Sequence, residues 1–475
     1  MSLRWRLAVL VGFTTLVLSL PGVWARSTYG AQVSVDEPQY LLTALSLAED
    51  GDLDISDELL AERYRTFHEL ELSHQTTELD ESGRQVSPHD PLLPLLLAPA
   101  TSAWGFEGAR VMLAVIAALT AIVTFLVAVD RHEVAPGVAA TVVLAFFAAA
   151  PLAPYATQIY PEMTAALLGV LGYRQLSGLA DAQGRQQNTN ILTLVVLISA
   201  LPWLAVKYVP IAASLGFSML WQLRSRRCHR LALISVGALA ASAAFYLILH
   251  QQLYGGWTVY AAGDHFIEAG EFSVMGTSPN YVGRVQRLLN LMVDRRFGLI
   301  PWNPAWVAAP AAMVWATTSS KTFRVNGAPA VAAGYSTATF LALTMHGWWS
   351  PGRQIVAILP LVVIAVAIMA SHTRWLLPPL MLLGFLGAIN WLTLAWESTT
   401  GRRTIVVDFW ETSALPYRAL DGVFPDLVLD ERPAPLQMLW LALILTSMAM
   451  AGHAARHWLG RYRIATPQLP VELGQ

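Results

Sequence analysis

The chain has 475 residues, of which 55% are hydrophobic and 13% are charged. Because soluble domains carry about 25% charged residues, this composition excludes an ordinary soluble protein and indicates a polytopic helical membrane protein. The net charge of −2 gives no reason to expect a nucleic-acid partner. The single cysteine, Cys228, excludes an intramolecular disulfide.

Apolar runs close to the length of a membrane-spanning helix, about 17–25 residues, recur along the whole chain. We therefore expect an all-α integral membrane protein with about twelve transmembrane helices in one membrane domain, residues 1–475. The twelve predicted spans are Leu7–Val23, Gly108–Val129, Pro136–Pro154, Met163–Ala180, Asn190–Val206, Tyr208–Leu223, Leu231–His250, Phe297–Ala316, Ala328–Met345, Gln354–Ala370, Trp375–Trp396 and Leu436–Gly452.

The basic connections orient these spans. With twelve spans, one side of the membrane receives the segments with Arg4 and Arg6, "DRHE", "RSRRCHR", Lys321 and Arg324, Arg374, and the three arginines after the last span. The positive-inside rule makes that side cytoplasmic, so both termini are expected there. Few cysteines and compact outer loops suit a bacterial plasma (inner) membrane.

The first span has an alternative interpretation. "MSLRWR", the apolar run and "VWA" before Arg26 also have the form of a signal peptide with a small-residue cleavage site. We favour a retained span, because the run ends in Pro21 and Gly22 with acidic residues close behind. Cleavage would leave the later topology unchanged.

The outer loops take up most of the remaining length. The first, residues 26–107, is strongly acidic, and further outer loops are expected at 251–296 and 397–435. Within the first loop, "ISDELLAERYRTFHELEL" predicts a helix that begins near Ser56. "HDPLLPLLLAPATSAWG" is too short and too rich in proline to span, and it predicts an interfacial helix before the second span.

The segment "DGDLDISDE" in this loop has some features of a calcium-binding loop. Counted from Asp50, however, the sixth position is Ile55 rather than glycine, and the twelfth is Ala61 rather than glutamate. We therefore expect no metal site of that kind and no resident cofactor, although a divalent cation at the active site stays open.

Ionisable residues stand at five positions near the outer ends of the predicted spans. Because such groups are costly at membrane depth, they usually face a cavity filled by water or ligand. None was used to count the spans, yet all fall on the non-cytoplasmic side. They are Asp36 and Glu37, Glu162, Lys207, Arg295 and Arg296, and the pair His346 and Arg353.

Carboxylates and fixed cations on one membrane face suit transfer of a sugar from a lipid phosphate. That reaction needs a base for the acceptor hydroxyl and cations for the leaving phosphate. Asp36 or Glu37 would be the base, with Glu162 as a further acid. The expected phosphate ligands are Lys207, Arg353, Arg295 and Arg296, since arginine binds phosphate bidentately.

Each of these residues also has a structural interpretation. The acids stand at helix starts, where they favour the helix dipole, and Lys207 could reach the membrane interface. Arg353 could instead form a salt bridge with an acid of an outer loop. His89 and His346 fit structural or interfacial roles better than catalysis.

In these motifs and their order, the sequence resembles integral-membrane glycosyltransferases of the GT-C fold. This is the class of polyprenyl-phosphate-sugar-dependent mannosyl-, arabinosyl- and aminoarabinosyl-transferases. Its early acidic pair is matched by "DEPQY", and its PPL helix is approached by "SPHDPLLPLLLAP". Its acid in the second outer loop is matched by "YPEM", and its later basic residue by "SPGRQ". The resemblance covers most of residues 1–370.

The resemblance implies an inverting enzyme that takes a sugar from a polyprenyl-phosphate donor in the bilayer. It implies an acceptor outside the cytoplasm, which could be a glycan, a lipid or a protein. The alternative function is a transporter or flippase of a lipid-linked or anionic substrate. Transporters commonly contain inverted repeats and midplane ionisable groups, and the sequence has no visible repeat. A non-catalytic scaffold is a third possibility.

Overall fold

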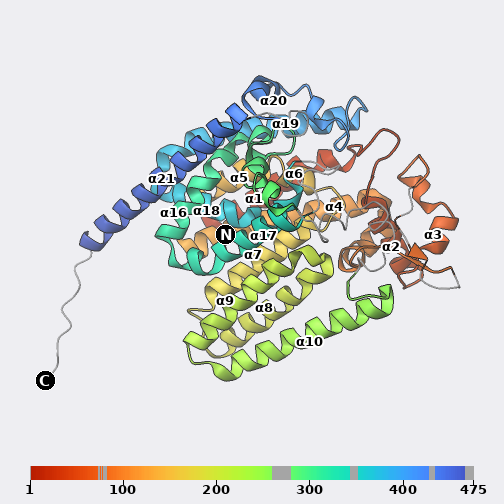
Figure 1. Ribbon diagram of the computed structural model, residues 1–475, viewed down its shortest axis with the longest axis horizontal. Helices are drawn as coiled ribbons and strands as arrows, with labels where there is room; N and C mark the ends of the chain where they lie inside the picture. The colour runs from red at the N-terminus through yellow and green to blue at the C-terminus, as the bar shows by residue number, and fades with distance from the viewer. Residues whose placement is uncertain are drawn as a thin grey trace.

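The computed structural model describes residues 2–72, 75, 77, 78, 83–258, 280–342, 351–426 and 434–465. These residues are predominantly helical, which agrees with the all-α prediction (Figure 1). The described part includes one short antiparallel ladder, β1 (Thr77–Glu78) with β2 (Gln85–Val86), in which Thr77 is opposite Val86.

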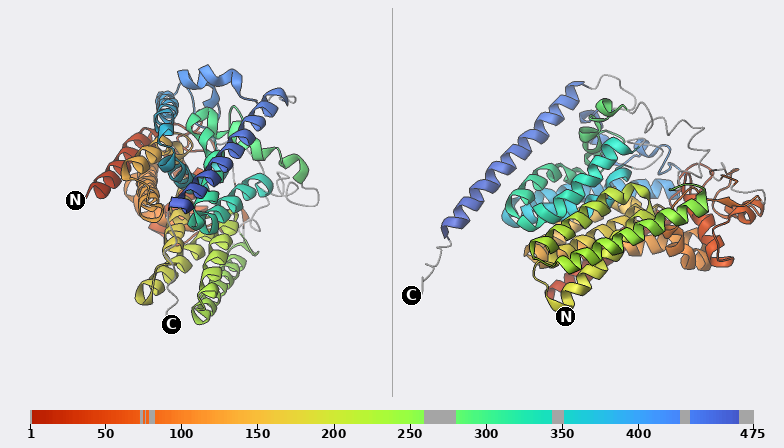
Figure 2. Two further views of the ribbon diagram at one scale, coloured as in Figure 1. Left: turned by 90° about the vertical axis from the view of Figure 1, so that its left-hand side faces the viewer. Right: turned by 60° about the horizontal axis from the view of Figure 1, so that its bottom comes forward.

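The helices form a bundle from which the first outer loop projects at one end (Figures 1 and 2). The main helices of the bundle are α1 (Leu3–Ser19), α4 (Leu92–His132), α5 (Pro136–Phe147), α7 (Glu162–Gly178), α8 (Gly184–Leu204), α9 (Val209–Ser225), α10 (His229–Tyr254), α16 (Ala309–Ser319), α18 (Leu359–His372), α19 (Leu377–Thr399) and α21 (Ala434–Ala465).

The remaining elements connect them or lie in the outer loops. The α-helices of this kind are α2 (Glu37–Glu49), α3 (Ser56–Leu60), α6 (Leu152–Tyr155), α13 (Tyr281–Arg284), α14 (Arg287–Val293), α15 (Leu299–Trp302), α17 (Ala328–Ser336) and α20 (Leu415–Leu420). Single turns of other helix types include η2 (Arg63–Thr66), η3 (Val206–Tyr208), η7 (Thr337–Leu341), η8 (Arg353–Ile358) and η10 (Phe409–Glu411).

Within the described residues, seven helices are long and apolar enough to cross a membrane. They are Leu3–Val23, Leu92–His132, Gly184–Leu204, His229–Tyr254, Arg353–His372, Arg374–Thr399 and Pro435–Gly460, and each contains one of the twelve predicted spans or most of it. The chain is therefore a membrane protein by helix length and composition, as predicted.

The other five predicted spans correspond to shorter helices, of which α7 and α9 have 17 residues each. Backbone breaks explain the difference. The third predicted span contains Pro151, and its helix α5 has only 12 residues. The ninth is divided between α17 and the π-helical turn η7. Hydropathy detects the apolar run but not these interruptions.

The expected interfacial helix is the first part of α4. Non-helical backbone angles at Trp104 and Gly105, the latter with φ of 63°, separate it from the membrane-spanning part. Gly108 follows at the kink, where a Cβ atom would lie 2.2 Å from the carbonyl oxygen of Ala100. Only glycine allows this close approach, so the helix can re-orient as it enters the bundle.

The helix expected from Ser56 is much shorter than predicted. α3 ends at Leu60, and Glu62 has a left-handed backbone with φ of 50°. The chain then makes the single turn η2. The first outer loop is consequently a set of short helices, with α2 packed along α4.

The basic loops and the candidate acids lie at opposite ends of the bundle. α7 begins at Glu162 and runs for 17 residues, which is about 25 Å at 1.5 Å per residue. Near its far end, Arg174 lies 3.9 Å from Asp130 of α4, and Asp130 also accepts a hydrogen bond from Arg4 at 2.6 Å. The N-terminus and the loop after α4 therefore share one end, and Glu162 marks the other.

Candidate functional site

Four residues that are far apart in the sequence form one charged cluster beside the first outer loop. Arg353 donates from Nε to Glu162 Oε1 at 2.9 Å and from Nη2 to Asp36 Oδ2 at 2.9 Å. Lys207 Nζ donates to the same Glu162 oxygen at 2.7 Å. The Glu162 side chain is 1% exposed and Arg353 8%, whereas Asp36 is 18% and Lys207 25% exposed. We call these four residues the charged cluster.

Each member stands where a helix starts or is interrupted. Asp36 directly precedes α2, whose first turn contains Pro38, and Glu162 follows Pro161 as the first residue of α7. Lys207 lies in η3, the turn between α8 and α9. Proline fixes φ and is well tolerated in a first helical turn, so these breaks bring the side chains to the same end of the bundle.

Arg353 depends on the glycine before it. Gly352 has a φ of 74°, and a Cβ atom there would lie 2.7 Å from Leu299 Cδ2 and 2.9 Å from Pro151 Cγ. Its N–H donates to the carbonyl oxygen of Phe297 at 3.2 Å. A side chain at this position would be both strained and obstructed, so glycine is needed to place Arg353 inside the cluster.

Tyrosines surround the charged cluster, and the sequence analysis missed them. The Arg353 guanidinium lies 4.0 Å from the ring centre of Tyr160, and Lys207 Nζ lies 5.4 Å from that of Tyr208. Both rings are almost completely buried. Among the described residues, the hydroxyls of Tyr160 and Tyr208 and the second oxygen of Glu162, Oε2, have no hydrogen-bond partner. They are available to bind the polar groups of a ligand. Tyr160 directly precedes "PEM" in the sequence, and this position beside Glu162 could have identified it as a residue of the site.

The cluster determines the protonation of its members. Burial alone would raise the pKa of Asp36, but Arg353, with smaller contributions from His89 and Lys207, outweighs it and holds that pKa below its ordinary value. Burial lowers the pKa of Lys207, and Glu162 opposes this effect. Asp36 is consequently a carboxylate at neutral pH and can accept a proton.

Glu37 has different surroundings from those of Asp36. It is 1% exposed, and its carboxylate accepts hydrogen bonds from Ser27 Oγ at 2.8 Å, from the Ser34 N–H at 3.1 Å and from the Ile159 N–H at 2.8 Å. Arg110 Nη2 lies 4.0 Å from Glu37 Oε1. Glu37 therefore joins the first outer loop to the segment before α7, with its oxygens already occupied by protein groups.

Arg295 and Arg296 come just before Phe297, whose carbonyl oxygen accepts a hydrogen bond from the Gly352 N–H. Their side chains, however, pair with acids outside the charged cluster. Arg295 contacts Asp421 at 3.2 Å and Asp426 at 3.0 Å, and Arg296 contacts Asp426 at 3.1 Å. The Arg296 guanidinium also lies 4.4 Å from the ring centre of Trp410. Of the four candidate phosphate ligands, the structure therefore brings Lys207 and Arg353 together, and Arg295 and Arg296 pair with other acids.

His89 lies at the edge of the site. Its ring stacks on that of Tyr40 with centres 4.5 Å apart, and burial lowers its pKa despite the nearby Asp36. The next residue, Asp90, accepts a hydrogen bond from Tyr246 Oη at 2.9 Å and lies 2.9 Å from His250 Nε2. This contact fastens α10 to the first outer loop. The other candidate histidine, His346, lies outside the described residues.

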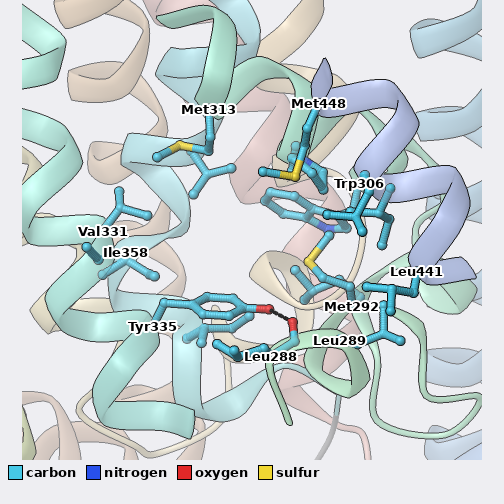
Figure 3. Close-up of a pocket in the computed structure, with 18 of the residues that line it drawn as sticks. Leu288, Leu289, Met292, Trp306, Met313, Val331, Tyr335, Ile358, Leu441 and Met448 are labelled. Atoms are coloured by element: carbon cyan, nitrogen blue, oxygen red, sulfur yellow. Dashed lines mark hydrogen bonds between the residues drawn. The ribbon is translucent and has the colours of Figure 1, made fainter. Parts of the chain in front are cut away.

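Residues that follow Arg353 in η8 and α18 line part of an apolar cavity of about 870 Å³ (Figure 3). Ile355, two residues beyond Arg353, lines it together with Ile358. Its wall comes from helices α14, α16, α17, α18 and α21, and the one hydroxyl labelled in Figure 3, that of Tyr335, donates to the Leu288 carbonyl oxygen at 2.8 Å. The other labelled lining residues are Leu289, Met292, Trp306, Met313, Val331, Leu441 and Met448. Such a lining suits an apolar chain.

No protein-family model matches this chain, and no curated protein sequence matches it. The solved structures similar to it include ArnT from Cupriavidus metallidurans bound to undecaprenyl phosphate and the same protein in the apo state. In each, the likeness covers 96% of this chain and 78% of ArnT, with a TM-score of 0.50 and 14% sequence identity. This likeness confirms the GT-C fold that the sequence predicted.

Proposed function

We propose that this protein is a membrane glycosyltransferase of the GT-C type that transfers a sugar from a polyprenyl-phosphate donor to an acceptor hydroxyl. The reaction would take place at the extracytoplasmic face of a plasma membrane, with both termini in the cytoplasm. The observation that carries the proposal is the charged cluster, in which the Asp36 carboxylate and two cations, Lys207 and Arg353, meet beside a large apolar cavity.

The cavity supports a donor with a long apolar tail. Ile355 and Ile358, which line it, follow Arg353 in η8, and in our proposal a lipid chain held there has its phosphate at the guanidinium. Arginine binds phosphate oxygens bidentately and stays charged. The similar ArnT structure contains undecaprenyl phosphate, a molecule of this class.

In the chemistry we propose, Asp36 takes the proton of the acceptor hydroxyl. The acceptor oxygen then forms a bond with the anomeric carbon of the sugar, and the bond from that carbon to the phosphate oxygen breaks. The electron pair leaves on the phosphate, where Lys207 and Arg353 stabilise the added negative charge. A single displacement of this kind inverts the anomeric configuration.

The ion pair between Arg353 and Asp36 suggests that the donor binds before Asp36 acts as the base. With both carboxylates bound to Arg353, a phosphate that enters competes with Asp36 for the guanidinium. Donor binding would thus release Asp36 and, by removing its strongest cation, raise its pKa and its basicity. Glu162 would remain to hold Lys207 and Arg353 in position.

The test is sugar transfer by purified protein in nanodiscs, with a panel of polyprenyl-phosphate sugars. Asp36→Asn is compared with Glu71→Gln, which removes an exposed charge from the same loop. Turnover with one donor that is lost in a folded Asp36→Asn protein and kept in the control would support the proposal. Donor binding without turnover, unchanged by Asp36→Asn, would instead indicate a transporter. If no donor binds, the proposed function is wrong.

A further inference from the structure

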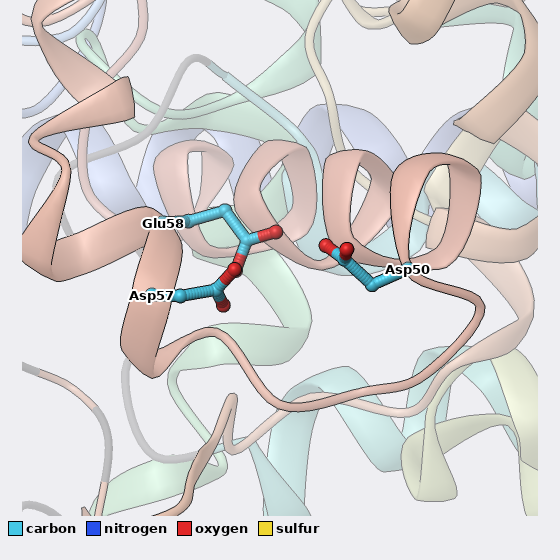
Figure 4. Close-up of side chains that lie close together, drawn as sticks. All are labelled: Asp50, Asp57 and Glu58. Carbon is cyan, nitrogen blue, oxygen red and sulfur yellow. The ribbon is translucent and has the colours of Figure 1, made fainter.

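A second group of carboxylates lies in the first outer loop, at the opposite end of α2 from Asp36. It consists of Asp50, which follows the last residue of α2, and Asp57 and Glu58 in the first turn of α3. One carboxylate oxygen from each lies within 4.8 Å of the others. Figure 4 shows the Glu58 side chain extending from α3 toward Asp50, with the Asp57 carboxyl beside it.

Glu58 is the unusual member of this group, since it is 2% exposed. Its oxygen Oε2 is buried and has no hydrogen-bond partner among the described residues. An ionised carboxylate in such a place is costly unless a cation or donors compensate it.

A cation of the same loop, Arg63 in η2, interacts electrostatically with Glu58 and Asp50. Its hydrogen bonds, however, go to both oxygens of Glu49, with Nη1 and Nη2 each 2.8 Å away. The single charge of Arg63 is thus shared with Glu49 and offsets only part of the negative charge of the three carboxylates.

We propose that Asp50, Asp57 and Glu58 bind a divalent cation, with Ca²⁺ preferred. Oxygen ligands select hard cations. Because Asp50 and Asp57 are exposed, water can complete the irregular shell that Ca²⁺ accepts and Mg²⁺ does not. This site differs from the loop excluded by its sequence spacing, because its ligands come from the ends of two helices that the fold brings together.

The proposed cation has a structural role that does not depend on the proposed function. α2 has 13 residues, so its C-terminal end lies about 20 Å along the helix from Asp36. A cation there is too far away to take part in chemistry at the charged cluster. It would fasten the end of α2 to α3 and so hold the first outer loop in place.

The test uses the whole protein in nanodiscs after treatment with EDTA. Isothermal titration with CaCl₂ alone should find one binding site per chain, and Ca²⁺ should raise the unfolding temperature because it binds the folded state. Glu58→Gln should weaken binding by at least about tenfold, since even loss of an indirect ligand partner costs that much. Glu71→Gln should bind Ca²⁺ as the wild type does.

Glutamine has the size of a protonated glutamate, so Glu58→Gln should fold in the absence of metal, and Asp50→Asn provides a second, exposed substitution. The proposal is wrong if folded wild-type protein binds no Ca²⁺, in which case Asp57 and Glu58 only share a proton. It is also wrong if Glu58→Gln and Asp50→Asn both bind Ca²⁺ as tightly as the control.

Discussion

Replacing Glu37 and replacing its neighbour Asp36 should damage the protein in different ways. Glu37 is buried, accepts three hydrogen bonds and lies 4.0 Å from the fully buried guanidinium of Arg110. In Glu37→Gln, the amide NH₂ group would face a donor, and Arg110 would lose its counter-charge. Breaking a buried ion pair from one side costs about 3–5 kcal/mol. The lost hydrogen bonds belong to the same network, so their cost overlaps with this value rather than adding to it.

Asp36→Asn should be much less destabilising. Asp36 is 18% exposed, and its partner Arg353 retains the hydrogen bond to Glu162. We expect a loss of about 1–3 kcal/mol, the usual range when one partner of a buried hydrogen bond is removed. Sugar transfer, in contrast, should disappear, because asparagine cannot accept the proton of the acceptor hydroxyl.

The assay combines thermal unfolding in nanodiscs, followed by tryptophan fluorescence, with sugar transfer measured well below the unfolding temperature of each variant. We expect a large drop in unfolding temperature with residual transfer for Glu37→Gln, and a small drop without transfer for Asp36→Asn. If folded Glu37→Gln were as stable as the wild type and inactive, Glu37 would be the base and our division of roles would be refuted.

Three further predictions concern the charged cluster and the cavity. Arg353→Met should weaken donor binding and raise the pKa of Asp36, which loses the cation that lowers it; if transfer remains, the acid limb of its pH–rate profile should move to higher pH. The free energy of unfolding should fall on acidification, below about pH 6.5 because of His89 and below about pH 4 because of Asp36. Folding lowers both pKa values, so the unfolded chain binds more protons in these ranges. Unfolding temperatures measured across this range test the sign, and a rise on acidification would contradict it. Ala332→Trp, which fills part of the cavity, should raise KM for a long-chain donor and leave a short-chain analogue unaffected, whereas equal effects on both donors would mean that the tail lies elsewhere.

The grouping of the four charged residues at one membrane face could be predicted from the sequence, because it requires only the number of spans that precede each residue. Asp36, Glu162, Lys207 and Arg353 each stand where an apolar run begins or ends, so counting spans assigns all four to one face. The number of preceding spans gives the face on which a residue lies, but it does not give the position of the side chain on that face. The same count assigned Arg295 and Arg296 to that face too, but Asp421 and Asp426, more than a hundred residues later, determine where their side chains point.

The distinction between Asp36 and Glu37 depends on structure finer than any run of residues. Successive residues at a helix start are about 100° apart, so two neighbouring acids cannot face the same ligand. The sequence left both as candidates for the base, and only the partners of each, Arg353 for Asp36 and the Ile159 N–H for Glu37, separate them.

The group formed by Asp50, Asp57 and Glu58 could not be predicted from sequence spacing for a similar reason. Spacing along the chain tests sites built from one continuous loop, and the segment after Asp50 fails that test. It cannot test a site in which α3 turns back toward the end of α2. The early end of that helix at Leu60, followed by the left-handed Glu62, changed the course of the loop and was not expected from its apolar periodicity.

The charged cluster is hard to explain as a stabilising feature. Two acids and two bases with side chains no more than 25% exposed have lost much of their hydration, and apolar residues of similar size often give equal or greater stability in such places. Within the cluster, both carboxylates converge on Arg353, and two residues that follow it in η8, Ile355 and Ile358, line the apolar cavity. A guanidinium between two competing anions can exchange one of them for a phosphate without being left uncompensated. That property serves a ligand that arrives and leaves, and it is why we regard the cluster as a site of chemistry rather than as part of the core.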